Sequence, residues 1–163
     1  GLTVDCTFCA CDNEDVDRYE ACLTLLLEGP TDRAVTIMDG PFPSLYPWDE
    51  DRGLSSLTSA RWTPMAKTCT WRDARAFIDS VHSYAVEAQG KAMIEQMSRY
   101  YPRIRDEYRI ADYRMAIRAM PRSAAAARLV NVVRVGKMAI RVRAGKLDAI
   151  FAAERRVLEM LNG

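Results

Sequence analysis

One dense apolar run, from Tyr19 to Glu28, constrains the fold of this chain more than any other sequence feature. It reads YEACLTLLLE, and a dense run of this length suits a strand that is buried on both faces of a sheet. Residues 29–32 (GPTD) follow it as a turn, and 34–38 predicts the returning strand. Residues 2–11 alternate as a half-buried strand does. These segments favour an antiparallel meander over an alternation of strands and helices.

The next segment of the chain is rich in proline. Residues 39–52 contain three prolines and one glycine, a composition that disfavours regular structure and predicts a long loop. Residues 54–64 resume a strand, and Pro64 is expected to end its ladder because proline has no N–H to donate. This part of the chain is therefore expected to add one strand to the meander.

The middle of the chain predicts one long helix. Thr70 is placed to cap its N-terminus, and Asp73 lies in the first turn, where the helix dipole favours a carboxylate. Apolar residues recur at helical spacing over 74–97, with a break near Gly90. The helix, kinked or straight, is expected to run to about Tyr100.

The C-terminal part of the chain predicts strands, a turn and a final helix. Residues 108–120 are expected as a strand, 128–142 as a hairpin that turns at 136–137, and 147–161 as a helix with one apolar stripe. The predicted fold class is α+β, a mostly antiparallel sheet of about six strands with one long packed helix and a C-terminal helix. The 163 residues are expected to form a single domain over 1–163.

The charge balance and hydropathy exclude several classes of partner. Lys and Arg number 23 and Asp and Glu number 22, so the chain has no general attraction to nucleic acid or to an anionic membrane. No apolar stretch reaches the roughly 18 residues that cross a bilayer, and the N-terminus shows no secretion pattern. We therefore expect a cytoplasmic protein with no nucleic-acid or membrane partner.

The five cysteines and one histidine give little support to a metal site. Cys6, Cys9 and Cys11 have a spacing that lets two thiolates share one tetrahedral ion, but a closed site needs a fourth ligand. Buried, reduced thiols are the expected state, and no metal is predicted. A thiol-metal protein remains an alternative that elemental analysis would exclude. The residues that would have to supply the fourth ligand by tertiary proximity are Cys22, Cys69 and His82, the last of which is expected within the long helix.

Aromatic residues and one arginine gather in the segment 40–64. Tyr46, Trp48 and Trp62 supply aromatic faces, and Arg61 offers a planar guanidinium to a carboxylate. These groups are typical of a pocket for a small acid or a sugar. The same residues also suit a loop that packs its own aromatic side chains against the sheet, and the sequence leaves both interpretations open.

The order of these features resembles the C-terminal, substrate-side portion of FAD-dependent oxidoreductases of the D-amino-acid oxidase superfamily. The motifs that carry the resemblance are DGPF at 39–42, SLYP at 44–47, SLT at 56–58, the long helix leading to YYP at 100–102, the Arg-rich hairpin, and GKLDAIF at 145–151. The resemblance covers most of 19–159. It implies a large antiparallel sheet that covers the isoalloxazine ring of the flavin.

The resemblance also implies FAD as the cofactor and two groups of site residues. The backbone amides of Gly145, Lys146 and Leu147 would face the pyrimidine edge of the flavin, where negative charge develops when the flavin accepts hydride. The substrate would be an amine, an amino acid or a related small polar metabolite. The residues implied for contact with this substrate are Tyr46, Arg61 and Arg118.

The chain contains no Gly-x-Gly-x-x-Gly fingerprint for a dinucleotide. The resemblance therefore implies a separate N-terminal FAD-binding (Rossmann) portion as a partner, and this chain alone is not expected to be active. Without that portion an apolar flavin-facing surface would be exposed, so a homodimer is expected. The alternative is a non-enzymatic module that uses the same sheet to bind a ligand or a protein.

Overall fold

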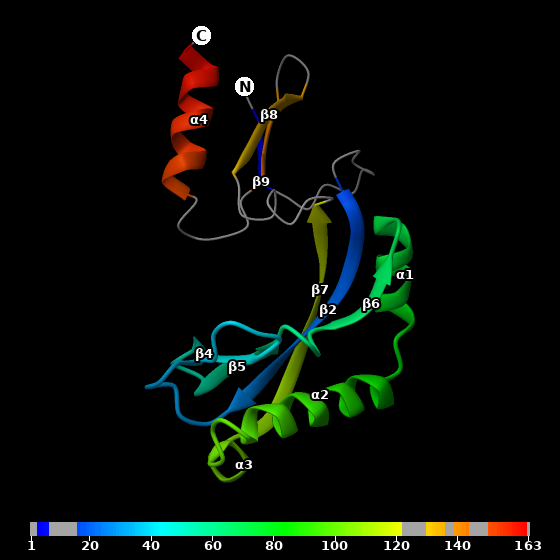
Figure 1. The fold of residues 1–163 in the computed structure, drawn as a ribbon, viewed down its shortest axis with the longest axis vertical. Helices are drawn as coiled ribbons and strands as arrows, with labels where there is room; N and C mark the ends of the chain where they lie inside the picture. The colour runs from blue at the N-terminus through cyan, green and yellow to red at the C-terminus, as the bar shows by residue number, and fades with distance from the viewer. Residues whose placement is uncertain (1–2, 7–15, 122–129, 136–138, 144–149, 163) are drawn as a thin grey trace.

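The computed structural model describes residues 3–6, 16–121, 130–135, 139–143 and 150–162. Within these ranges the chain forms a six-stranded sheet, a three-stranded sheet and four helices (Figure 1). Every strand pair of the larger sheet is antiparallel. The predicted fold class, an α+β protein with a mostly antiparallel sheet, a packed helix and a C-terminal helix, is confirmed.

Strand β2 (Val16–Glu28) is the centre of the larger sheet and contains the apolar run. Along one edge it pairs with β7 (Arg109–Pro121), which confirms the strand predicted there. Along its other edge β6 (Pro64–Thr68) pairs with the first half of β2, and β5 (Leu54–Ser59) pairs with the last part. Every residue from Tyr19 to Leu27 except Thr24 is buried, which follows from this central position.

A layer of helices covers one face of this sheet. Helix α2 (Ser83–Ser98) packs on the side chains of β2 that alternate inward, with the short helix α3 (Ile104–Glu107) at its end. Helix α1 (Trp71–Ser80) contacts β2, β6 and β7. Full burial of each leucine contributes roughly 1.5–3 kcal/mol to folding. The buried core consists of Leu23, Leu25, Leu27, Leu45, Leu57, Val86, Met93, Met97, Ile104 and Tyr108.

The proline-rich segment is a strand, so the prediction of a long loop over 39–52 is wrong for most of that segment. Strand β4 (Pro43–Asp49) pairs with β5, and a register shift follows Pro47. On its other edge β4 meets only the two-residue strand β3 (Val35–Thr36). Proline, which has no N–H, is tolerated in β4 because most of the edge that faces β3 forms no backbone hydrogen bonds with another strand. Cross-strand pairing has overridden the local composition.

The strand predicted over 54–64 is divided between β5 and β6. The hydrogen bonds that hold the turn between them include one from the Ser59 amide to Thr63 Oγ1 at 2.9 Å and one from the Leu23 amide to the Thr63 carbonyl at 2.7 Å. Pro64 therefore begins β6 and does not end a ladder. The turn lets two short strands share one edge of the longer β2.

The predicted long helix is two helices, and the break lies at Val81 and His82. Val81 has extended backbone angles, φ −64° and ψ 128°, and His82 occupies the N-cap position of α2. Gly90 lies inside α2, where a Cβ atom would stand 3.2 Å from Leu25 Cδ2. Glycine at this position serves the close approach of helix and sheet. The predicted cap is confirmed, because Thr70 Oγ1 accepts a hydrogen bond from the Asp73 amide at 3.1 Å.

The smaller sheet has the strand order β1 (Thr3–Cys6), β9 (Ala139–Arg143) and β8 (Asn131–Val135). Strands β8 and β9 pair antiparallel, which confirms the predicted hairpin, whereas β1 pairs with β9 in parallel. Helix α4 (Ile150–Asn162) contacts β8 and confirms the predicted C-terminal helix. Figure 1 shows this sheet and α4 at one end of the molecule, beyond the ends of β2 and β7.

Candidate functional site

The face of the larger sheet opposite α2, called here the outer face, carries the candidate site. Side chains alternate along a strand, so those of β2 that do not enter the α2 core lie on this face. Residues opposite each other in neighbouring strands share a face, which extends the assignment across the sheet. The outer-face residues are Glu20, Cys22, Thr24 and Leu26 on β2, Asp112, Arg114, Ala116 and Arg118 on β7, Ser56 on β5 and Tyr46 on β4.

A carboxylate held between two guanidinium groups lies on this face. Arg118 donates to Glu20 Oε2 from Nη2 at 2.6 Å and from Nε at 3.2 Å, and Arg18 Nε donates to Oε1 at 2.9 Å. The Glu20 side chain is 3% exposed, whereas those of Arg118 and Arg18 are 47% and 38% exposed. Arg18 also pairs with Asp17 at 3.0 Å. The arginines therefore shield Glu20 from solvent while presenting part of their own surface to it.

Glu20 remains ionised in this environment. Burial disfavours its charged form, but the hydrogen bonds from Arg118 and Arg18 outweigh that cost and lower the pKa of Glu20 below its ordinary value. A charged Glu20 fixes the plane of the Arg118 guanidinium. The Arg118 N–H groups that Glu20 does not engage are thereby oriented for a polar ligand.

Cys22 is next to this cluster and is chemically quiet. Cys22 as a residue is 8% exposed, and it lies opposite Ala116 on β7 and Pro64 on β6. Burial raises the pKa of the Cys22 thiol, although the positive charge of Arg118 opposes the shift. Burial and the raised pKa both favour the neutral thiol over the nucleophilic thiolate.

The structure separates the three residues implied for substrate contact. Tyr46 lies on the outer face, 45% exposed, and its hydroxyl forms a hydrogen bond with the Thr36 hydroxyl. Arg118 shares that face. Arg61 lies in the turn between β5 and β6, where its guanidinium stacks over the Trp62 ring at 4.9 Å, and no contact within the described residues joins it to the other two.

The sequence left open whether the aromatic residues of the segment 40–64 line a pocket or pack against the sheet, and the structure shows that they differ in this respect. Trp62 packs against the α2 core, and its carbonyl accepts a hydrogen bond from Gln89 at 2.6 Å. Tyr46 and Trp48 are exposed. Packing against the protein explains Trp62, whereas Tyr46 remains available to a ligand.

Several predicted positions lie outside the described residues. These are Gly145, Lys146 and Leu147 of the implied flavin contact, together with Cys9 and Cys11. Among the residues that the structure does describe, no group of three potential metal ligands occurs. His82 is exposed between α1 and α2 rather than within one long helix.

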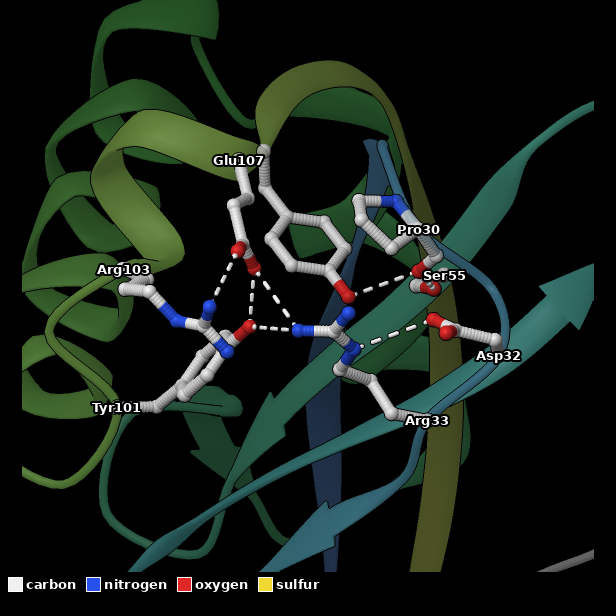
Figure 2. Close-up of polar contacts among 8 residues, drawn as sticks. Pro30, Asp32, Arg33, Ser55, Tyr101, Arg103 and Glu107 are labelled. Atoms are coloured by element: carbon white, nitrogen blue, oxygen red, sulfur yellow. Dashed lines mark hydrogen bonds and ion pairs between the residues drawn. The ribbon is translucent and has the colours of Figure 1, made fainter.

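A second polar cluster, which the sequence did not indicate, connects the segment after β2 to α3 (Figure 2). Arg33 Nη1 donates to the Tyr101 hydroxyl at 2.7 Å and to Glu107 Oε2 at 3.2 Å, and the Tyr101 hydroxyl donates to Glu107. Hydrogen bonds to Asp32 and Tyr101 raise the pKa of Arg33. Tyr108 donates to the Pro30 carbonyl at 2.8 Å. These groups satisfy one another, which favours a structural role.

The outer face is more exposed to solvent than this second cluster. In Figure 2 the side chains of Arg33, Tyr101 and Glu107 point toward one another between the segment that carries Arg33 and α3. On the outer face, Arg114, Ala116 and Arg118 of β7 are exposed. Of the two clusters, the outer face is therefore the one that can receive a further molecule.

The described helices include none that is long and apolar enough to span a membrane. Neither the family models nor the solved structures searched give a match to this chain. Over 145 residues, 88% of the chain, the sequence is 37% identical to the FAD-dependent monooxygenase FPY4 of Fusarium mangiferae. The match spans 39% of that relative, so the chain corresponds to less than half of its length.

Proposed function

We propose that this chain is the substrate-binding and flavin-covering part of an FAD-dependent oxidoreductase. The observation that carries the proposal is the 37% identity to the Fusarium monooxygenase over 88% of the chain. Identity at this level over nearly the whole chain supports a common fold and a common place in a larger protein. The relative's cofactor is therefore the one we assign to the complete protein.

The residues of the outer face fit a covering role. The small side chains of Cys22 and Ala116 lie opposite each other in the middle of β2 and β7, and the longer side chains of Arg114 and Arg118 lie on either side of Ala116. A face with this distribution can accept a planar group and orient a small polar molecule against it. FAD, when bound, supplies hydride acceptance from a carbon that bears an amine or a hydroxyl.

We assign substrate orientation to Arg118, which lies opposite Glu20. Tyr46 is retained as a predicted contact, and it lies at the level of Leu26, roughly 20 Å further along β2 at the rise of a strand. The guanidinium of Arg118, held in place by Glu20, is suited to a carboxylate, and the Tyr46 hydroxyl is suited to a neutral polar group. Arg61 is retained as a predicted contact, although its turn is not joined to these residues by a described contact. The substrate class is an amine, an amino acid or a related small polar metabolite, as in the D-amino-acid oxidase superfamily.

The flavin edge is assigned to Gly145, Lys146 and Leu147. Backbone amides at a turn that opens a helix can stabilise negative charge, and the ammonium of Lys146 adds to that effect. The chain has no dinucleotide fingerprint, so we assign the binding of FAD to an N-terminal portion of the complete protein. We assign the complete protein to the cytoplasm. This chain alone is expected to bind FAD weakly and to be inactive.

The test is the visible spectrum of the complete gene product after purification and incubation with FAD. A stoichiometric flavin band that survives gel filtration supports the proposal, and the isolated 163-residue chain serves as the control that should lack it. The alternative, a non-enzymatic ligand- or protein-binding module, would be favoured if the complete protein had no upstream dinucleotide-binding sequence, showed no flavin band and took up no added FAD.

A further inference from the structure

We infer that an exposed apolar stripe on α4 is the surface on which the nucleotide-binding portion of the complete protein docks, an inference that rests on the proposed function. The stripe consists of Ile150, Phe151, Leu158 and Leu161, which are 54%, 75%, 50% and 47% exposed. Four large apolar side chains on one short helix form a patch of the kind that marks a protein interface.

The stripe is distinct from the side of α4 that already has a partner. Ala153 is buried, Val157 and Met160 are half-buried, and Arg134 of β8 donates a hydrogen bond to the Met160 carbonyl. At 100° per residue the stripe lies beside these residues on the helix. The stripe spans about 100° of the helix circumference, with the exposed Glu154 among its residues, next to the about 60° that Ala153, Val157 and Met160 occupy. The apolar arc of α4 is therefore wider than the side that faces β8.

The smaller sheet supplies an independent reason to expect a covering partner. Strand β1 pairs with β9 in parallel, from Thr3 opposite Ala139 to Cys6 opposite Val142. All-parallel sheets occur almost only where helices cover both faces, and many α/β sheets carry an antiparallel edge strand, the position that β8 has here. Here α4 contacts β8 within the described residues, and β1 has no described neighbour on its second edge. The sheet has the character of one end of a larger α/β sheet.

The occupant we assign is the portion of the complete protein that lies outside this chain. The Fusarium relative extends far beyond the match, which spans 39% of its length, and a nucleotide-binding α/β unit contains the parallel strands and helices that would complete this sheet. A second copy of this chain fits less well. Two identical edges related by a two-fold axis pair antiparallel, which would not continue the parallel order of β1 and β9.

The test compares the accessibility of two sides of α4 in the complete gene product. Cysteine is introduced singly at two stripe positions, Phe151→Cys and Leu158→Cys, and at two exposed polar positions as matched controls, Arg155→Cys and Glu159→Cys. Maleimide labelling of the native protein is followed peptide by peptide with mass spectrometry, so the native cysteines do not interfere. We expect labelling of the stripe positions to be slower than that of the controls by about tenfold, independent of protein concentration.

Equal labelling rates at stripe and control positions would overturn the inference. Protection that disappears on dilution, together with a dimer in light scattering, would overturn it in favour of a second copy. The flavin spectrum of the same samples separates this result from the proposed function. Flavin bound with an accessible stripe refutes the docking surface alone, whereas a protected stripe without flavin refutes the flavin assignment and, with it, the nucleotide-binding portion as the occupant of the stripe.

Discussion

Arg118 donates hydrogen bonds from both Nε and Nη2 to one carboxylate oxygen of Glu20, although 98 positions separate the two residues in the chain. The two residues are opposite each other in the β2–β7 ladder, so the register of the sheet alone brings them together. Arg18 occupies the second oxygen of the same carboxylate. Both the stability of the outer face and the orientation of Arg118 depend on this one buried charge.

Glu20→Gln is expected to lower the free energy of unfolding by about 1 to 3 kcal/mol, because it leaves two guanidinium groups without their buried anion. Urea unfolding followed by circular dichroism measures the change. The matched control is Glu87→Gln, since Glu87 forms a solvent-exposed pair with Lys91 and should show no resolvable effect. Equal stability of the two variants would show that the Glu20 cluster contributes nothing to folding.

The stability of the protein should fall on acidification, in part through Glu20. Because the pKa of Glu20 in the folded protein lies below its ordinary value of 4.5, the unfolded chain binds this proton more readily. The stabilisation is complete above that value and is lost as the pH falls through the folded pKa. Unfolding free energies measured from neutral pH downward should decline less steeply for Glu20→Gln than for the wild type. Parallel curves would contradict the assignment.

Gly29→Ala is expected to destabilise the protein by about 1 to 3 kcal/mol through overpacking. A Cβ atom at this position would stand 2.6 Å from the backbone carbonyl oxygen of Glu107 and 2.6 Å from Tyr108 Cδ1. The backbone of α3 cannot yield without moving the cluster around Arg33. Thermal unfolding provides the measurement, and Ala34→Ser, at an exposed position of the same segment, is a control that should leave the melting temperature unchanged.

Tyr101→Phe tests the second polar cluster. The hydroxyl accepts from Arg33 and donates to Glu107, so its removal should cost about 1 kcal/mol. The neighbouring Tyr100→Phe is the control, because Tyr100 is 44% exposed and its hydroxyl makes no hydrogen bond in the described part of the chain. Denaturant midpoints that shift equally for both variants would rule out a specific role for the Tyr101 hydroxyl.

Lys146→Met in the complete protein is expected to lower the reduction potential of the bound flavin, because it removes a positive charge assigned to the edge where negative charge develops on reduction. Spectroelectrochemical titration measures the potential. Lys91→Met, on the exposed side of α2 beside Glu87, removes the same charge elsewhere and should leave the potential unchanged. A shared shift would point to net charge rather than to the place of Lys146.

The elements that local sequence predicts are those whose signals lie close together in the chain. Each of these elements is predicted by a residue pattern that spans no more than about one element length. The patterns are the apolar run of β2, the alternation of β7, the β8–β9 hairpin and the helical periodicity of α4. The cap at Thr70 is of the same kind, since its partner Asp73 is three residues away. Such signals need no knowledge of the remaining chain.

The features that were predicted wrongly depend on partners distant in sequence. Residues 43–49 form a strand despite Pro43 and Pro47, because β5 pairs with them and β3 is too short to demand their missing N–H groups. The helix breaks at Val81, while Gly90, which looked like a breaker, meets Leu25 of β2. In each case the packing against β2 or β5 outweighs the local preference.

Residue order along the chain was enough to specify the α+β class, the central strand and the C-terminal helix, because periodicity and capping act between near neighbours. Four other features follow from the tertiary structure alone. These are the ion pair of Glu20 with Arg118, the Arg33 cluster, the parallel β1–β9 pair and the exposure of the α4 stripe. Each depends on strand register or on which faces remain uncovered after packing, and those quantities are set by the chain as a whole.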